Sequence, residues 1–225
     1  GRAAMPKSKR AQKITLSKTK SKGFDGKSQF IDEVRSCVDK YSSVYVFTVD
    51  NLRNTQLKLL RAQWPDSRFF YGRARQIAVA LGRTPEAEIR DGMSNVVQSL
   101  LGRESGLVFT NRSREDVESF FSSYSHDDFA RAGFVATETH RLPAGPLPQF
   151  AHSLEPYLRK LGLPTALDCG VIVLSRDFTV CEEGNKLTPD QAKLLQLLGV
   201  KLAAFKVNMR AMWKDGEFTE LSVAG

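Results

Sequence analysis

The chain has 225 residues, enough for one large or two small domains, and 41% of them are apolar, which allows a buried core. Neither an apolar run of about 18 residues nor a secretory signal occurs, so we expect no membrane-spanning helix and no secretion. Three cysteines without close pairing, Cys37, Cys169 and Cys181, favour a reducing compartment over a disulfide framework.

The positive charge is concentrated at the N-terminus. The chain carries 33 lysines and arginines against 25 acidic residues, a net charge of +8. Residues 1–24 contain eight of the basic residues and no acid, so the rest of the chain is neutral overall. A basic arm of this kind is disordered alone and typically binds nucleic acid or an anionic membrane surface. We expect its nucleic-acid contacts to include Lys7, Lys9, Arg10 and Lys13.

The next part of the chain predicts a helix followed by two strand–helix units. The elements are a helix over 27–41, a strand over 44–49, a helix over 54–64, a strand over 69–71 and a helix over 73–81. The helix over 54–64 places Leu57, Leu60 and Trp64 on one face and leaves Lys58 and Arg61 exposed.

Two further helices and a buried strand complete the first domain. Thr84-Pro85-Glu86 has the chemistry of a helix start, with Thr as N-cap and Pro at the first position, and predicts a helix over 84–100. A short apolar run predicts a buried strand over 106–110. Ser113 opens the last helix, over 113–124, and Asn111 is expected to help cap it.

The composition changes near Gly133, where we place an inserted second domain. Its predicted elements are a polar strand over 135–142, a stiff proline-rich loop, a helix over 153–161, strands over 170–174 and 178–181, and a helix opened by the capping box Thr188-Pro189-Asp190-Gln191. A final hairpin over 205–218 cannot fold alone, so we return it to the sheet of the first domain.

These elements predict an α/β fold, a sandwich-like α+β arrangement with a smaller α/β domain inserted into it. Residues 1–24 form the basic tail, residues 25–132 together with 205–225 form the first domain, and residues 133–204 form the inserted domain. The first domain therefore closes only when the last segment of the chain joins it.

A basic rim is expected at one end of the first domain. From Arg53 to Arg83 there are seven basic residues and one acid, Asp66. Both predicted helices in this stretch begin directly after a strand, where free backbone N–H groups also favour phosphate. We predict RNA held through its backbone rather than by base stacking, because the aromatic residues lie in buried runs. The candidate RNA-binding residues are Arg53, Asn54, Lys58, Arg61, Arg73, Arg75 and Arg83.

Other kinds of site are poorly supported, and we predict no catalytic residue, no metal and no cofactor. Neither GxxxxGK[ST] nor GxGxxG occurs, and Gly102 and Gly106 are interpreted as turn glycines. The cysteines and histidines are too scattered for zinc. His126-Asp127-Asp128 is more often a solvated loop than an acid–base group, and His152-Ser153 is interpreted as a helix N-cap.

Many short motifs, in one order over 24–218, resemble the family of the ribosomal stalk-base protein, the L-ten family. They are Val49-Asp50-Asn51, Phe70-Tyr71-Gly72-Arg73, Val108-Phe109-Thr110-Asn111, Ala130-Arg131-Ala132-Gly133, Gly162-Leu163-Pro164-Thr165 and Trp213-Lys214-Asp215-Gly216. Further motifs resemble a branch of this family that acts in ribosome assembly: Met5-Pro6-Lys7-Ser8-Lys9-Arg10, Arg53-Asn54, His152-Ser153-Leu154-Glu155-Pro156 and Leu187-Thr188-Pro189.

The resemblance implies a non-catalytic ribosome biogenesis factor with an rRNA-binding α/β domain and an insertion. Its implied partners are large-subunit rRNA at the stalk-base site, the pre-60S particle with its neighbouring ribosomal proteins, and a phosphatase-type release factor, but no membrane. The implied location is the nucleus and nucleolus, with shuttling to the cytoplasm. The stalk protein has Gly-Lys-Asn where this chain has Gly72-Arg73-Ala74-Arg75, which loses the Asn and adds an arginine.

Two alternatives remain at this point. The chain could be the mature stalk-base protein in truncated form, since the segments that bind acidic stalk proteins are not found before Gly225. It could also be an RNA-processing enzyme, which would need paired carboxylates or a metal site at the basic rim, where only Asp50 and Asp66 lie near.

Overall fold

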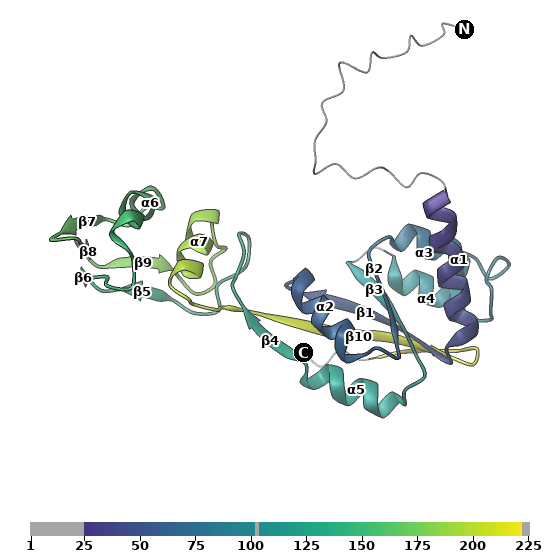
Figure 1. Cartoon of the computed structure of the whole chain (residues 1–225). Helices are drawn as coiled ribbons and strands as arrows, with labels where there is room; N and C mark the ends of the chain where they lie inside the picture. Colours follow the sequence, from purple (N-terminus) through teal and green to yellow (C-terminus); the bar gives the residue numbers. More distant parts are fainter. Residues whose placement is uncertain (1–24, 102–103, 222–225) are drawn as a thin grey trace, which may run out of the picture.

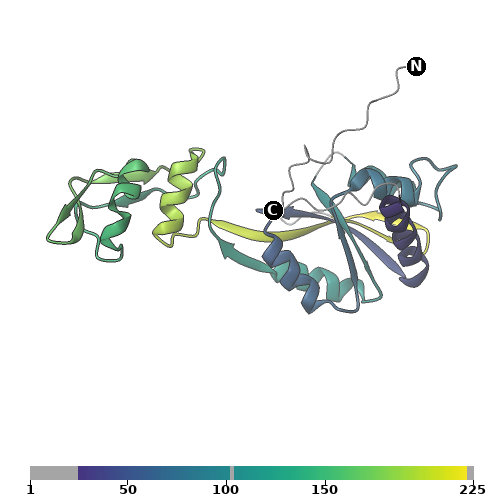
Figure 2. The same cartoon turned by 45° about the horizontal axis from the view of Figure 1, so that its top comes forward.

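The computed structural model describes residues 25–101 and 104–221, and it has two parts (Figure 1). A six-stranded sheet with helices on both faces forms what we call the body. A smaller part, which we call the inserted domain, extends from one edge of the body (Figures 1 and 2). The predicted α/β class with an inserted domain is therefore confirmed.

The sheet of the body is antiparallel and is built around the last long strand of the chain. Its order is β11-β10-β1-β3-β2, and β4 also pairs with β10. The bounds are β1 Ser43–Asp50, β2 Arg68–Tyr71, β3 Ser105–Thr110, β4 Ser125–Asp128, β10 Ala203–Lys214 and β11 Glu217–Glu220. Strand β10 pairs with β1 and with β11, so the final hairpin does return to the sheet of the first domain.

Helices α1, α3 and α4 cover one face of this sheet and helices α2 and α5 cover the other. The bounds are α1 Asp25–Lys40, α2 Asn54–Gln63, α3 Ala74–Leu81, α4 Met93–Leu100 and α5 Arg114–Ser123. One apolar cluster joins α1, α3 and α4 to alternate residues of β1 such as Val44 and Val46. The other cluster joins Leu57, Leu60 and Trp64 to the remaining residues of β1, such as Tyr45, which alternate with Val44 and Val46. Because both faces are covered, β1 is buried from Ser43 to Phe47.

The inserted domain has an aliphatic core of its own, from Ala130 to Ala203. Its elements are β5 His140–Leu142, β6 Gly145–Pro146, a 3₁₀ turn His152–Leu154, α6 Glu155–Lys160, β7 Thr165–Asp168, β8 Val171–Leu174, β9 Phe178–Cys181 and α7 Pro189–Leu197. The capping box of α7 is present as predicted, with Gln191 N 3.2 Å from Thr188 Oγ1. Two strand segments, Ser125–Asp128 of β4 and Ala203–Lys206 of β10, connect the two parts, and we call this pair the neck.

The predicted helix over 84–100 is wrong in its first half. Thr84 and Ala87 close a single turn, and the helix α4 begins only at Met93, after Gly92 with φ of 82°. The carboxylate of Glu88 accepts hydrogen bonds from the backbone N–H groups of Gly92 and Ser94, at 3.1 and 2.9 Å. The Glu88 side chain therefore satisfies free N–H groups at the start of α4, and the helix begins there rather than at Thr84.

Several smaller predictions also need correction. Gly106 lies inside β3 rather than in a turn, where an added Cβ would come within 2.5 Å of Phe70 O. The side chain of Asn111 accepts from Ser42 N at 2.8 Å and so fixes the start of β1 instead of capping α5. His152 and Ser153 lie in a 3₁₀ turn in which no side chain acts as a cap.

The strands of the inserted domain differ in part from those predicted. The strand predicted over 135–142 is reduced to its last three residues as β5, and Val135 makes an isolated bridge to Lys186. Strand β7, Thr165–Asp168, was not predicted from the sequence.

Candidate nucleic-acid interface

The strand–helix junctions predicted to bind RNA lie at one edge of the body. Strands β1 and β2 both run antiparallel to β3, which lies between them, so they run in the same direction. Thr48 near the end of β1 pairs with Ser105, and Tyr71 at the end of β2 pairs with the next residue, Gly106. The first turns of α2 and α3 therefore start from the same edge, which we call the basic edge.

Arg73 is an exposed cation of the basic edge. It precedes α3 in the left-handed conformation, with φ of 54°, directly after Gly72 with φ of 73°. These two residues turn the chain sharply, and the Arg73 guanidinium lies 5.1 Å from the ring centroid of Phe30 in α1. Arg73 is exposed and, within the described residues, has no acidic partner within 4 Å.

Arg75 lies in the first turn of α3 and is also exposed, with no carboxylate within 4 Å among the residues that the structure covers. That first turn contains no acidic residue, and no side chain caps it. The positive end of this helix therefore lies beside two exposed arginines, Arg73 and Arg75, an arrangement that suits a phosphate oxygen.

Arg53 is placed differently, because it already has a partner. Its Nε lies 2.9 Å from Asp128 Oδ2, and its Nη2 donates to the backbone oxygen of Phe129. The two charged side chains are only 21% and 19% exposed. Asn51, two residues earlier, donates from Nδ2 to Ala204 O at 2.9 Å. The loop between β1 and α2 thus holds both strands of the neck, while Asn54 at the start of α2 stays exposed.

The expectation that all the predicted cations share one edge is wrong for Arg61. Arg61 occupies the last turn of α2, and burial, followed by the charge of Arg68, lowers its pKa. Arg68 begins β2 and pairs with Glu33, so it lies at the opposite edge.

The remaining predicted residues are spread more widely. Lys58 is exposed in the second turn of α2, and Arg83 is exposed beyond the far end of α3. The four tail residues Lys7, Lys9, Arg10 and Lys13 lie outside the described residues.

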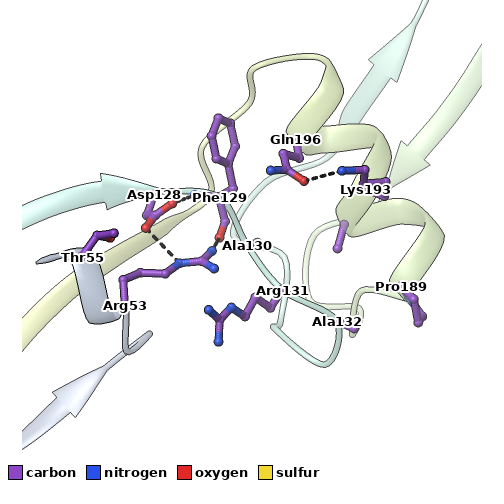
Figure 3. Close-up of a pocket in the computed structure, with 11 residues that line it drawn as sticks. Arg53, Thr55, Asp128, Phe129, Ala130, Arg131, Ala132, Pro189, Lys193 and Gln196 are labelled. Atoms are coloured by element: carbon purple, nitrogen blue, oxygen red, sulfur yellow. Dashed lines mark hydrogen bonds and ion pairs between the residues drawn. The ribbon is translucent and has the colours of Figure 1, made fainter. Parts of the chain in front are cut away.

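A cavity of about 490 Å³ lies where the neck meets the inserted domain (Figure 3). Its lining includes Arg53 and Asp128 from the body side and Arg131 and Lys193 from the inserted domain. Sequence patterns did not predict a site with Arg131 and Lys193, because these residues are 62 residues apart in the chain and only the fold brings them together. Arg131 did stand in one of the family motifs, Ala130-Arg131-Ala132-Gly133, which was the available signal.

The residues weighed for catalysis have structural partners. The His126 ring meets Tyr124 edge-on at 5.2 Å, and Asp128 is the partner of Arg53. No group of three His, Cys, Asp or Glu side chains that could hold a metal exists among the described residues. Over the same residues, no helix is both long and apolar enough to pass through a membrane.

The chain matches two family profiles that divide it where the structure does. Residues 23–126 match the family described as "Ribosomal protein L10". Residues 130–200 match the insertion domain of the 60S ribosomal protein of that family. The boundary between the two matches falls at the neck.

Curated relatives cover nearly the whole chain. It is 38% identical to "Ribosome assembly factor mrt4" of Dictyostelium discoideum, with 96% of each chain covered. It is 42% identical to the protein of the same name in Schizosaccharomyces pombe, over 91% of this chain and 90% of the relative. Similarity to "Large ribosomal subunit protein uL10" of Podospora anserina is weaker, at 25% identity over 88% of this chain and 62% of that protein.

Proposed function

We propose that this chain is a non-catalytic protein that binds large-subunit rRNA. It belongs to the mrt4 family of ribosome assembly factors and, with that family, to the ribosomal protein L10 family. A role in ribosome biogenesis related to L10 follows from the family itself. The finer proposal is that the chain occupies the stalk-base site, also called the GTPase-associated site, of 60S precursors. It holds that site until the mature stalk protein replaces it.

The observation that carries this proposal is the arrangement of Arg73 and Arg75 at the basic edge. Both side chains are exposed, and neither has an acidic partner within 4 Å in the described part of the chain. Unpaired guanidinium groups beside an uncapped helix start are suited to the phosphate backbone of RNA. Residues 25–225 are neutral overall, so this local excess of positive charge supports a specific place of contact.

The mature stalk-base protein is the second candidate, and the identities favour the assembly factor. Identity to the mrt4 proteins is 38% and 42% with both chains almost fully covered, against 25% for uL10. The names of the relatives point to a non-enzymatic role. We therefore place the chain in nuclear and nucleolar precursors, with rRNA processing continuing around it. Shuttling to the cytoplasm and a phosphatase-type release factor, both implied by the family resemblance, belong to the same proposal.

The test reverses charge at the basic edge and compares it with the opposite edge. We expect Arg73→Glu together with Arg75→Glu to weaken binding to an rRNA fragment of the stalk base by about 2–4 kcal/mol, because two phosphate partners become repulsive. The melting temperature should change little, since both side chains are exposed. The control is Arg61→Glu, a single charge reversal at the opposite edge, which should weaken binding by much less than half as much.

The variants should also be followed in cells, where the basic-edge variant should no longer co-sediment with nuclear pre-ribosomal particles. Wild-type affinity of the Arg73→Glu/Arg75→Glu protein at moderate salt would show that RNA binds elsewhere. Equal losses for this variant and for Arg61→Glu would show that general charge, and not this edge, controls binding. Cleavage of the fragment by the purified protein with a divalent metal would instead support the enzyme.

A further inference from the structure

The cavity at the neck carries more positive charge than its own carboxylate can balance. Arg53, Arg131 and Lys193 line it, and Asp128 is the acidic residue of its lining. One oxygen of Asp128 accepts from Arg53 Nε at 2.9 Å, and the other accepts from Phe129 N at 2.7 Å. This carboxylate is therefore already occupied and leaves two cations of the cavity uncompensated.

The two remaining cations face the cavity from the inserted domain. Figure 3 shows the Arg131 side chain reaching into the space beside Arg53, and Lys193 on helix α7 at the other side. The partner of Lys193 is a neutral amide, Gln196 Oε1 at 3.0 Å. Among the described residues, Arg131 and Lys193 have no carboxylate within 4 Å. The cavity thus offers a guanidinium and an ammonium group to an anion.

The start of helix α7 does not account for this charge. Its lining residue Pro189 has no N–H to donate, and the Thr188 hydroxyl already satisfies the N–H of Gln191. An anion in this cavity would therefore be held by the side chains of Arg131 and Lys193.

The cavity is held in a fixed position relative to the basic edge. The loop between β1 and α2 fixes β4 through Arg53 and fixes β10 through Asn51. In the sheet, Asp50 at the end of β1 pairs with Lys206 of the neck. The neck therefore leaves the body at the same edge of the sheet from which α3, with Arg73 and Arg75, also starts.

We propose that this cavity takes a backbone phosphate of the same rRNA that the basic edge binds, held by Arg131 and Lys193. The inference rests on the proposed function and deepens it, because it makes the inserted domain part of the RNA surface. A volume of about 490 Å³ has room for a phosphate with its sugar. RNA fits better than an isolated anion, because its regularly spaced phosphates reach the cavity and the basic edge together.

The test is Arg131→Gln with Lys193→Gln in the full chain, measured against an rRNA fragment of the stalk base over a series of salt concentrations. We expect affinity to fall about tenfold near physiological salt. The slope of log Kd against log salt should shrink by roughly 0.7–0.9, because one phosphate contact is lost. The matched control is Lys160→Gln with Arg176→Gln, which removes two exposed charges elsewhere in the inserted domain and should leave the slope unchanged.

Three results would overturn the inference. They are an unchanged affinity, a loss of affinity with an unchanged salt slope, and an equal change in the control. A variant that binds RNA normally but no longer joins pre-ribosomal particles would assign the cavity to an acidic or phosphorylated protein instead. The variant Arg73→Glu/Arg75→Glu tests the proposed function separately. If that variant loses RNA binding while Arg131→Gln/Lys193→Gln does not, only the inference about the cavity fails.

Discussion

The body and the inserted domain are held together by different kinds of core. The body has an apolar cluster on each face of one sheet, rich in aromatic rings such as Phe47, Phe69 and Phe109. The inserted domain has a single, mainly aliphatic cluster over two small sheets of two and three strands. Both tryptophans of the chain, Trp64 and Trp213, belong to the body. The stability of the two parts can therefore be measured separately, with tryptophan fluorescence reporting on the body alone.

The largest effect is expected from Gly106→Ala, which should destabilise the body and spare the inserted domain. An added Cβ would come within 2.5 Å of Phe70 O and 2.6 Å of the Phe47 ring, in the middle of a buried strand. We expect the free energy of unfolding, from denaturant titration followed by tryptophan fluorescence, to fall by about 3 kcal/mol. Hydrogen exchange should show unchanged protection in α7. Parallel losses in both parts would mean that they unfold as one unit.

A smaller effect is expected from Asp128→Asn, which weakens the link between the two parts. Both side chains of the Arg53–Asp128 pair are about 20% exposed, so we expect the free energy of unfolding to fall by about 1–2 kcal/mol. Arg53 should still donate to the Phe129 carbonyl. The orientation of the inserted domain should become less defined. Spin labels on Cys169, the exposed native cysteine, and on Gln63→Cys should then show a broader distance distribution. An unchanged distribution would mean that the strands of the neck alone fix the orientation.

Replacing residues 133–202 by a short flexible linker should leave the body folded. The replacement keeps β4 and β10 intact, and the apolar clusters of the body contain no residue from the inserted domain. We expect the fluorescence transition to shift by about 1 kcal/mol or less, because only the contacts at the neck change. A body that fails to fold would contradict the division into two domains that we propose.

The smallest effect is expected from Asp66→Asn, which removes an exposed pair with Arg112. The Arg112 guanidinium donates two hydrogen bonds to Asp66, at 2.8 and 3.0 Å, and lies over the Trp64 ring at 4.1 Å. This hydrogen bonding lowers the pKa of Asp66. The pair therefore stabilises the fold in full at pH values above the ordinary pKa of an aspartate, about 4. This stabilisation is lost as the pH falls through the lowered pKa of Asp66. Because Asp66 is half exposed, we expect Asp66→Asn to lower the free energy of unfolding by less than about 1 kcal/mol at neutral pH. In strong acid the variant and the wild type should be equally stable.

Local patterns in the sequence predicted most of the elements but could not place all of the site. Helix α2 was predicted with its buried face because Leu57, Leu60 and Trp64 repeat at helical spacing. The helix over 84–100 failed because the cap comes from Glu88, whose carboxylate reaches forward to Ser94. The residue types at the predicted helix start, Thr84-Pro85-Glu86, do not indicate that contact.

The basic edge was predictable from the strand–helix order, whereas the partner of Arg53 was not. The Arg53 side chain meets the Phe129 backbone across 76 residues of sequence, and no periodicity encodes such a contact. The same limit applies to Arg131 and Lys193, whose shared cavity depends on how the neck folds. Residues on one element could be assigned to a face, but contacts between elements required the tertiary structure.

The place of β10 in the sheet has a consequence for the order of events during synthesis. This strand lies between β1 and the pair β4 and β11, yet it follows the inserted domain in the chain and therefore leaves the ribosome after it. Until residues 203–214 emerge, β1 has an unpaired edge, whereas the inserted domain is already complete. We therefore expect stalled nascent chains, in which residues up to 202 have left the exit tunnel and later residues have not, to contain a protease-resistant inserted domain and a protease-sensitive body. Equal resistance of both parts would show that the body folds without its central strand.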